Sequence, residues 1–204
     1  MNQNRKVFAF IDVQNTETTA LKVLNFIFDW QKLINYLETR WNCEKIFFYP
    51  GVQENDEIRK GLFMGLVGNQ SEVIVRTKEY RVYKNQDKVS SVNCPNCKKD
   101  VIHKIDMGYS WKCNCDVEMT LDVLKHSTKD TDVLLFTGDG DFAFLIEEII
   151  QNETKVYIFS SALSAGNTGS KRLSKKLKKL TNQNGSPVQL IELRNLQKII
   201  QKDI

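Results

Sequence analysis

Aspartates at the ends of two apolar runs have the chemistry of a divalent-cation site. Asp12 follows the run at 7–11, and Asp139 and Asp141 follow the run at 133–136. Carboxylates at close range repel one another, so they stay ionised together only if a cation neutralises them. Mg²⁺ binds a few carboxylates and keeps water and phosphate oxygens in its remaining positions. We therefore predict a Mg²⁺ or Mn²⁺ site for phosphodiester chemistry, at which the metal activates a water nucleophile.

A further pair of aspartates lies on the predicted helix 116–126. Asp116 begins this helix, and Asp122 lies six positions later, about 120° around the helix axis. The two side chains cannot both face one metal, so Asp116 is the predicted ligand and Asp122 is expected to lie behind the ligands or face solvent. The alternative for each aspartate is an ordinary role as a turn former or helix cap.

Four of the five cysteines form a second candidate metal site. Cys94-Pro95-Asn96-Cys97 and Cys113-Asn114-Cys115 resemble the two knuckles of a zinc ribbon, which supply four tetrahedral thiolates. The second knuckle has one intervening residue where two are usual, so Cys115 is the weaker ligand and His103 its candidate replacement. Free or redox-active thiols are the alternative. Because Cys115 precedes Asp116, a structural zinc would fix the start of the helix that carries the predicted carboxylate ligand.

A basic segment is the candidate nucleic-acid interface. Leucines at 173, 177 and 180 form one apolar stripe, so the segment is expected to dock as a helix with its cations facing outward. No acidic residue lies between Ser160 and Ile191, which favours a track for a phosphate backbone over an ordinary solvated face. Lys112, within the cysteine block, is a further candidate. The predicted nucleic-acid-binding residues of the basic segment are Lys171, Arg172, Lys175, Lys176, Lys178 and Lys179.

The elements that must position these residues alternate between strands and helices. The pattern predicts an α/β fold with a mostly parallel central sheet flanked by helices. Ligands of such sheets bind beyond the carboxyl ends of the strands, where the aspartates fall. We expect strands at 7–11, 45–49, 132–137, 155–160 and 188–192, an extended segment at 73–83, and helices at 30–41, 56–66, 116–126, 142–150 and 170–180 with one more closing the chain.

Composition excludes two classes of protein. The 204 residues are 41% hydrophobic with a net charge of +4, enough apolar material for a core, which excludes disorder over the whole length. No apolar run approaches the roughly 20 residues that cross a bilayer, and the polar start does not resemble a signal peptide. We expect one cytoplasmic domain over 1–204, with the zinc-ribbon-like insertion at 90–115.

Three segments together resemble the signature blocks of NYN domains, the PIN-like group that includes LabA-type proteins. The resemblance covers about residues 6–180 and implies a PIN-like Rossmannoid fold with metal-dependent ribonuclease activity. It implies an acidic cluster of Asp12, Asp116, Asp139 and Asp141, with Asn15 beside it. Val13 and Thr137 replace a usual Gly and Ser. The three blocks are Phe10-Ile11-Asp12-Val13-Gln14-Asn15, Cys115 to Leu124, and Leu134-Leu135-Phe136-Thr137-Gly138-Asp139-Gly140-Asp141-Phe142.

The hypothesis that follows is a divalent-metal-dependent ribonuclease acting on RNA, with single-stranded RNA expected. Asn15 and Thr137 would position groups around the metal, and the basic helix would hold the strand. The alternative is a catalytically silent RNA-binding or regulatory adaptor of the same fold. The sequence leaves open RNA against DNA, the number of metals and the oligomeric state.

Overall fold

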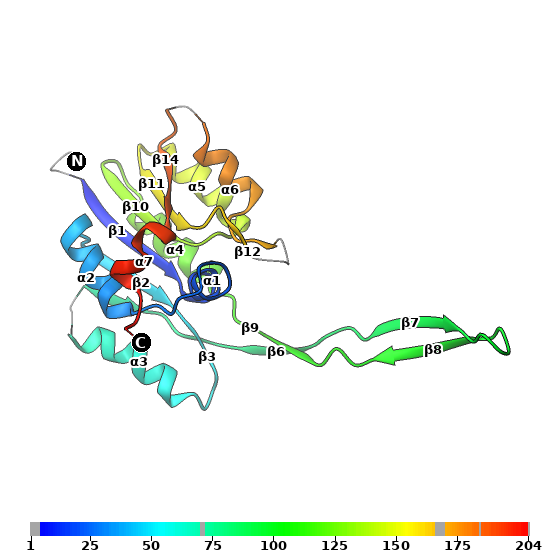
Figure 1. Cartoon of the computed structure of the whole chain (residues 1–204). Coiled ribbons are helices and arrows are strands. Elements are labelled where there is room, and N and C mark those ends of the chain that lie inside the picture. Colours follow the sequence, from blue (N-terminus) through cyan, green and yellow to red (C-terminus); the bar gives the residue numbers. More distant parts are fainter. Residues whose placement is uncertain (1–4, 70–71, 166–169, 184, 204) are drawn as a thin grey trace.

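A six-stranded parallel sheet forms the centre of the protein in a computed structural model of the chain (Figure 1). The structure describes residues 5–69, 72–165, 170–183 and 185–203. The strand order is β14-β11-β10-β1-β2-β4, and every neighbouring pair is parallel. The strands of this sheet are β1 (Lys6–Asp12), β2 (Lys45–Tyr49), β4 (Val73–Val75), β10 (Thr131–Phe136), β11 (Lys155–Ser160) and β14 (Val188–Glu192).

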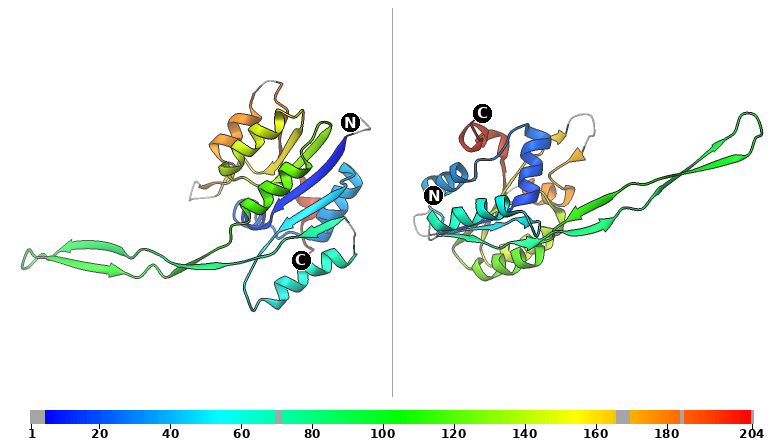
Figure 2. Two further views of the ribbon diagram at one scale, coloured as in Figure 1. Left: turned by 180° about the vertical axis from the view of Figure 1, so that it is seen from behind. Right: turned by 90° about the horizontal axis from the view of Figure 1, so that it is seen from below.

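Helices cover both faces of the sheet (Figure 2). One apolar cluster joins α2, α3 and α7 to one face, and a second joins α4, α5 and α6 to the other. The helices are α1 (Val13–Thr19), α2 (Trp30–Trp41), α3 (Glu57–Asn69), α4 (Asp116–His126), α5 (Ala143–Ile150), α6 (Lys175–Thr181) and α7 (Gln197–Ile200), with a π-helical turn η1 (Ala20–Leu24) and 3-10 turns η2 (Gly140–Phe142) and η4 (Leu193–Leu196). The predicted α/β fold with a parallel central sheet is confirmed.

Strand β1 shows why this sheet needs helices on both sides. Val7, Ala9 and Ile11 belong to the first apolar cluster, whereas Phe8 and Phe10 belong to the second. Side chains alternate between the two faces of a strand, and here both faces are buried. A continuous apolar run is therefore the expected pattern for this central strand. The run ends at Asp12, at the carboxyl end of the strand.

The predicted helices at 30–41 and 116–126 agree with α2 and α4. Asp29 caps α2 by accepting a hydrogen bond from the backbone N–H of Lys32 at 3.0 Å. The sequence prediction missed α1 and the π-helical turn η1, because Val13 to Leu24 is rich in Thr and lacks a clear apolar stripe. Among the described residues, no helix is both long and apolar enough to span a bilayer.

A two-stranded arm projects from the domain between β4 and α4 (Figures 1 and 2). It begins at Arg81, earlier than the predicted insertion at 90. Its antiparallel pairs are β6 (Arg81–Lys84) with β9 (Tyr109–Lys112) near the base, and β7 (Lys88–Asn93) with β8 (Asp100–Ile105) toward the tip. Short pairs elsewhere are β3 (Gly51–Val52) with β5 (Lys78–Glu79), and β12 (Ser164–Ala165) with β13 (Ser170–Lys171).

The order of the strands fixes where a ligand can enter. From β1 the chain builds the sheet outward through β2 and β4, then returns to the other side of β1 as β10 and continues through β11 to β14. The direction of winding reverses between β1 and β10, and the loops after these two strands therefore diverge. Such a switch point leaves a crevice at the carboxyl ends of the strands.

Candidate functional site

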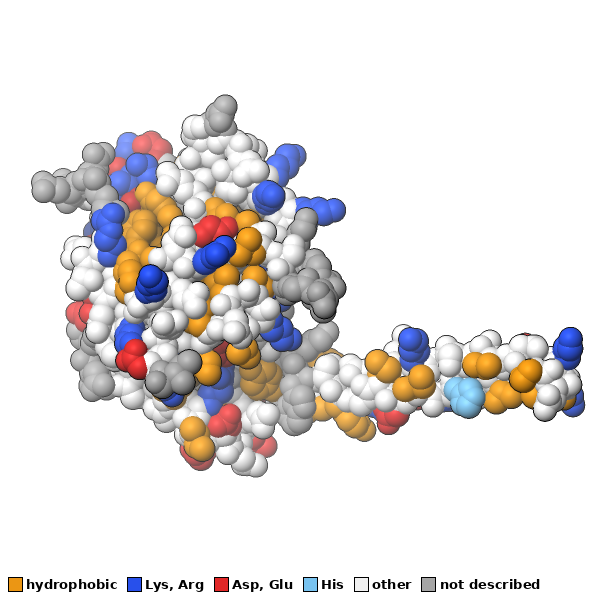
Figure 3. Space-filling view, in the orientation of Figure 1, with side chains coloured by type: hydrophobic (Ala, Val, Ile, Leu, Met, Phe, Trp, Pro, Cys, Tyr) orange, Lys and Arg blue, Asp and Glu red, His pale blue; other side chains and the backbone are white. Residues whose placement is uncertain are grey.

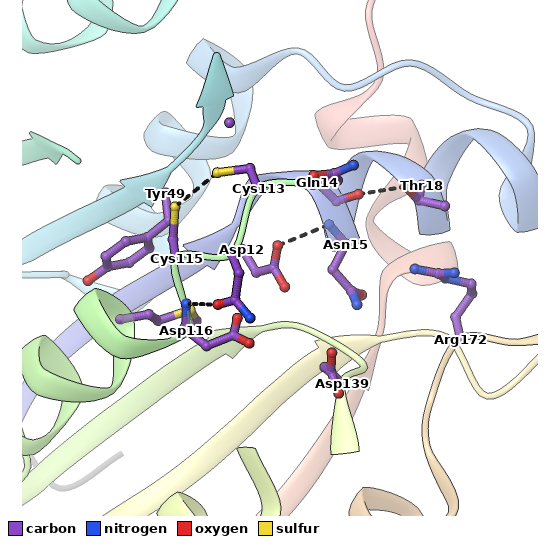
Figure 4. Close-up of a pocket in the computed structure, with 13 residues that line it drawn as sticks. Asp12, Gln14, Asn15, Thr18, Tyr49, Cys113, Cys115, Asp116, Asp139 and Arg172 are labelled. Atoms are coloured by element: carbon purple, nitrogen blue, oxygen red, sulfur yellow. Dashed lines mark hydrogen bonds between the residues drawn. The ribbon is translucent and has the colours of Figure 1, made fainter. Parts of the chain in front are cut away.

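A pocket of about 340 Å³ opens at this switch point (Figure 4). Asp12 enters it from the end of β1, Asp139 from the loop after β10, and Asp116 from the first turn of α4. In Figure 4 the three carboxylates point toward the same space. The fold thus brings three predicted acidic side chains, far apart in the sequence, to one cavity.

Asp12 is held in place by the backbone and by a hydroxyl. Its carboxylate caps α1, accepting a hydrogen bond from the Asn15 backbone N–H at 3.0 Å and another from Thr137 Oγ1 at 3.2 Å. The same hydroxyl accepts the N–H of Asp139 at 3.2 Å, and Asn15 Oδ1 accepts the N–H of Gly138 at 3.0 Å. Asn15 and Thr137 therefore tie the loop after β10 to the end of β1.

The carboxylates of the pocket disfavour one another's ionisation. Burial raises the pKa of Asp12 to about 6, with the nearby charges of Asp116 and Asp139 adding to the shift and the hydrogen bonds from Asn15 and Thr137 opposing it. Burial and the charges of Asp139 and Asp141 also raise the pKa of Asp116. A bound cation would relieve this repulsion.

The donor set suits a hard divalent cation such as Mg²⁺ or Mn²⁺, because it consists of carboxylate oxygens that face one open pocket. In the part of the chain that the structure describes, however, no three His, Cys, Asp or Glu side chains gather closely enough to hold a metal ion as they stand. The residues fit the ion in chemistry and direction, and their carboxylates would draw together around it.

Asp139 and Asp141 differ in position. Asp139 caps the 3-10 turn η2 by accepting the N–H of Asp141 at 3.0 Å, and its carboxylate reaches the pocket. Asp141 is exposed and does not line the pocket, although it lies near enough to affect the pKa of Asp116. Asp141 is therefore an outer member of the acidic cluster.

Asp122 does not face solvent, which was one of its two predicted positions. It is buried, accepts a hydrogen bond from Tyr49 Oη at 2.9 Å and forms an ion pair with Arg76. Burial and the Asp122 charge raise the pKa of Tyr49, so its hydroxyl remains a proton donor. Tyr49 lines the pocket. Asp122 thus fixes a wall of the pocket from behind.

The glycines of the loop after β10 are required by close packing and not by a left-handed backbone conformation. Neither Gly138 nor Gly140 has a positive φ. Instead, a Cβ at Gly138 would lie 2.1 Å from the carbonyl oxygen of Arg172, and one at Gly140 would lie 2.8 Å from Ser174 Oγ. Ser174 also donates its N–H to the Gly138 carbonyl at 2.9 Å. The missing side chains let the basic segment pack directly against the acidic loop.

The basic segment consequently lies beside the pocket. Arg172 lines the pocket and donates from Nε to Thr19 Oγ1 at 3.3 Å. Helix α6 is shorter than predicted, since it starts after Ser174, which caps it. Leu173, Leu177 and Leu180 are buried as expected. Lys175, Lys176, Lys178 and Lys179 are exposed, and no described carboxylate lies within ion-pair distance of them. The side chains of Lys112 and Lys171 lie outside the described part of the structure.

The four cysteines do not form one zinc site within the chain, contrary to the ribbon prediction. Cys94 and Cys97 lie at the tip of the arm, where β7 turns into β8, whereas Cys113 and Cys115 lie at its base beside the pocket. The reason is the strand pairing of 81–84 with 109–112 and of 88–93 with 100–105, which keeps the two pairs at opposite ends of an extended ribbon. His103, the candidate replacement ligand, is exposed on β8.

Several pocket residues were not predicted. Tyr49, Gln14, Thr18 and Gly51 line the pocket together with the aspartates. Tyr49 was detectable in principle, because it ends the strand next to β1 and pairs in register with Asp12. Gln14 and Thr18 lie on α1, which the sequence pattern did not reveal. Val13, in place of the usual Gly, is fully buried at the start of α1 and points into the core.

Comparisons with other proteins give a family and a fold. Residues 6–192 match the sequence model of the NYN domain. A crystal structure of a protein of unknown function from Vibrio parahaemolyticus has a similar fold, with a TM-score of 0.59 and 20% sequence identity over 95% of each chain. Among proteins with curated descriptions, none matches this sequence.

Proposed function

Given that the chain belongs to the NYN domain family, whose members have a PIN-like, nuclease-like domain, we propose that it is a divalent-metal-dependent ribonuclease. The observation that carries this proposal is the convergence of Asp12, Asp116 and Asp139 on one pocket that Arg172 also lines. Metal-dependent phosphodiester hydrolysis uses acidic side chains to hold a cation and basic side chains to hold a phosphate. The match spans most of the chain, including all four predicted acids.

Asp12, Asp116 and Asp139 would hold Mg²⁺ or Mn²⁺, with Asp141 at the rim. When bound, the cation supplies neutralisation of negative charge and Lewis acidity toward the phosphodiester. Asp12 is kept in a fixed orientation by the Asn15 N–H and the Thr137 hydroxyl, so little side-chain freedom is lost on binding. Thr137 also orients the backbone of Asp139 through its N–H.

The basic residues would bind the substrate. Arg172 at the pocket wall would contact the phosphate next to the scissile bond, and the exposed lysines of α6 would follow the strand outward. A neighbouring pocket of about 440 Å³ shares Gln14 and Thr18 with the first, which extends the hollow surface along α1. Two adjoining pockets on one side of α1 suit an extended single strand of RNA.

Cleavage assays test the proposal directly. Labelled single-stranded RNA and DNA would be incubated with Mg²⁺, Mn²⁺ or EDTA, using the wild-type protein and Asp139→Asn, with the zinc content of both measured. We expect metal-dependent cleavage of RNA by the wild type only. Absence of cleavage together with salt-sensitive RNA binding would instead support the RNA-binding adaptor.

Metal affinity is expected to depend on pH near 6. The cation binds the ionised form of Asp12, whose pKa is raised to about 6 in the metal-free protein. Protons therefore compete with the metal below that pH, and the apparent Kd for Mn²⁺ should rise by about tenfold for each pH unit below 6 while staying nearly constant above 7. Isothermal titration calorimetry from pH 5 to 8 measures this. A constant Kd across the range would contradict the role of Asp12 as a ligand.

Neutralising α6 is expected to weaken RNA binding at all sequences equally. Replacing the lysines at 175, 176, 178 and 179 with Gln should reduce the slope of log Kd against log salt by up to about 3, because each contact with a single-strand phosphate contributes about 0.7. Fluorescence anisotropy at several salt concentrations measures the slope. The matched control is Lys45→Gln with Lys155→Gln. These exposed lysines begin β2 and β11, at the end of the sheet opposite the pocket. An equal loss of slope per lysine removed in the two variants would show a nonspecific charge effect.

A further inference from the structure

The tip of the arm has the geometry of half a zinc site. Backbone N–H groups of Cys97 and Asn96 hydrogen bond to the Cys94 sulfur. The turn is closed by the N–H of Lys98 to the Cys94 carbonyl and by the N–H of Cys94 to the Lys99 carbonyl, both at 2.9 Å. Lys98 adopts a positive φ of 59° to complete it. The tip of the arm thus presents two thiols.

The base of the arm presents the other half. Cys113 Sγ and Cys115 Sγ lie 3.6 Å apart, close to the edge of about 3.8 Å in a tetrahedron of sulfurs at 2.3 Å from zinc. Both side chains are half-buried and line the open pocket, so a ligand can reach them from solvent. Each pair alone offers two of the four ligands that a structural zinc needs.

One chain does not complete either pair. From Arg81 to Asn93 an extended strand covers about 40 Å at roughly 3.3 Å per residue, and the arm's own pairing holds it straight. The described residues offer no third His, Cys, Asp or Glu that would complete a metal site at either end. The missing ligands must come from another molecule.

The described apolar side chains of β7 and β8 are exposed. Register places Val92, Val101 and Ile105 on one face of the β7–β8 ribbon and Val89 and Ile102 on the other, and all five are exposed. Figure 3 shows hydrophobic side chains along the arm on the face in view. An isolated two-stranded ribbon is only marginally stable in water, so an apolar surface on the arm calls for a covering partner.

We propose that two copies of the chain exchange arms, and that each arm tip completes a four-thiolate zinc site with the base of the other copy's arm. Cys113 and Cys115 would bind one Zn²⁺ together with Cys94 and Cys97 of the partner subunit. The two arms have equal length, so a twofold axis through their midpoints that seats one tip seats the other as well. The arms then lie antiparallel, so the exposed valines and isoleucines of β7 and β8 lie against the base half of the other arm, where Val82 and Tyr109 are exposed. This proposal does not depend on nuclease activity.

Zinc content and molecular mass, measured together on the protein purified with a reductant, test the exchange. We expect one Zn²⁺ per chain and a dimer, which becomes monomeric when a chelator removes the zinc. One Zn²⁺ per chain in a monomer would mean that the arm folds back onto its own base. Half a Zn²⁺ per chain in a dimer would mean that two tips meet. Either result, or absence of zinc, would overturn the proposal.

Complementation between two variants distinguishes exchange from every closed arrangement. Cys94→Ser with Cys97→Ser removes the tip ligands, and Cys113→Ser with Cys115→Ser removes the base ligands. Each variant alone should be monomeric and lack the four-thiolate absorption spectrum of bound Co²⁺. Mixed at equal concentration they should form a heterodimer with one intact site, recovering half the Co²⁺ signal per chain. No recovery from two variants that retain the wild-type circular dichroism spectrum would contradict the exchange.

Discussion

Asp12→Asn is expected to lower metal-dependent RNA cleavage by about 10²- to 10³-fold, since loss of one charged ligand removes several kcal/mol of stabilisation from the transition state. The fold should survive, because Asn caps a helix as well as Asp does and its Oδ1 can still accept the Asn15 N–H; the Thr137 hydroxyl, which donates to the other carboxylate oxygen, would have to find another acceptor. Single-turnover cleavage at saturating Mn²⁺ measures the loss. The matched control is Glu147→Gln, which removes an exposed negative charge on α5.

The same substitution has an opposite effect on stability. Because folding raises the pKa of Asp12 to about 6, the folded protein binds a proton more tightly than the unfolded chain does. The stability that this tighter proton binding gives the folded protein falls as pH rises from about 4 to about 6 and stays low above that. Without divalent cations, Asp12→Asn should therefore unfold at the same or a higher temperature than the wild type at pH 7.5. A lower Tm with lost cleavage would indicate a structural role instead.

Gly138→Ala is expected to destabilise the fold by about 2–3 kcal/mol, which corresponds to a fall in Tm of roughly 5–10 °C for a chain of this size. The added Cβ would lie 2.1 Å from the Arg172 carbonyl oxygen and 2.7 Å from Ser160 Oγ, and the nearest obstacle is backbone. Relief of the clash must move either the acidic loop or the basic segment, so RNA affinity should fall as well. Thermal unfolding and anisotropy measure the two effects.

Gly65→Ala is the matched control for that substitution. Gly65 lies within α3, and a Cβ there meets nothing within 4 Å. Alanine favours the helix, so this variant should be more stable than the wild type by about 0.5–1 kcal/mol. If Gly138→Ala behaved like Gly65→Ala, the close approach of the acidic loop and the basic segment would not be a constraint on the fold.

The helices and strands were predictable wherever the buried residues recur in the sequence at the spacing of a helix or a strand. The alternation of strands and helices predicted the parallel sheet, and the predicted bounds 30–41 and 116–126 agree with α2 and α4. The ends of β1 and β10 also followed from the sequence, because aspartates directly follow their apolar runs. Local patterns of this kind carry the fold class and the positions of Asp12 and Asp139.

Features set by distant contacts were not predictable. Gly138 is small because of Arg172, and Asp122 is buried because Arg76 and Tyr49 lie opposite it. The spacing of residues along the chain marks none of these three partners. The cysteine pattern misled for a related reason, since knuckle spacing identifies two pairs of ligands and does not reveal whether the intervening strands fold back or extend.

The hydrogen bond between Thr137 and Asp12 joins residues 125 positions apart, and that between Asn15 and Gly138 joins residues 123 apart. Contacts of such long range form only after the intervening chain has been ordered. During synthesis, a ribosome-bound chain would therefore lack a completed pocket until β10 and the loop after it had left the exit tunnel. Because of this strand order, the proposed activity can begin only after most of the domain has been synthesised.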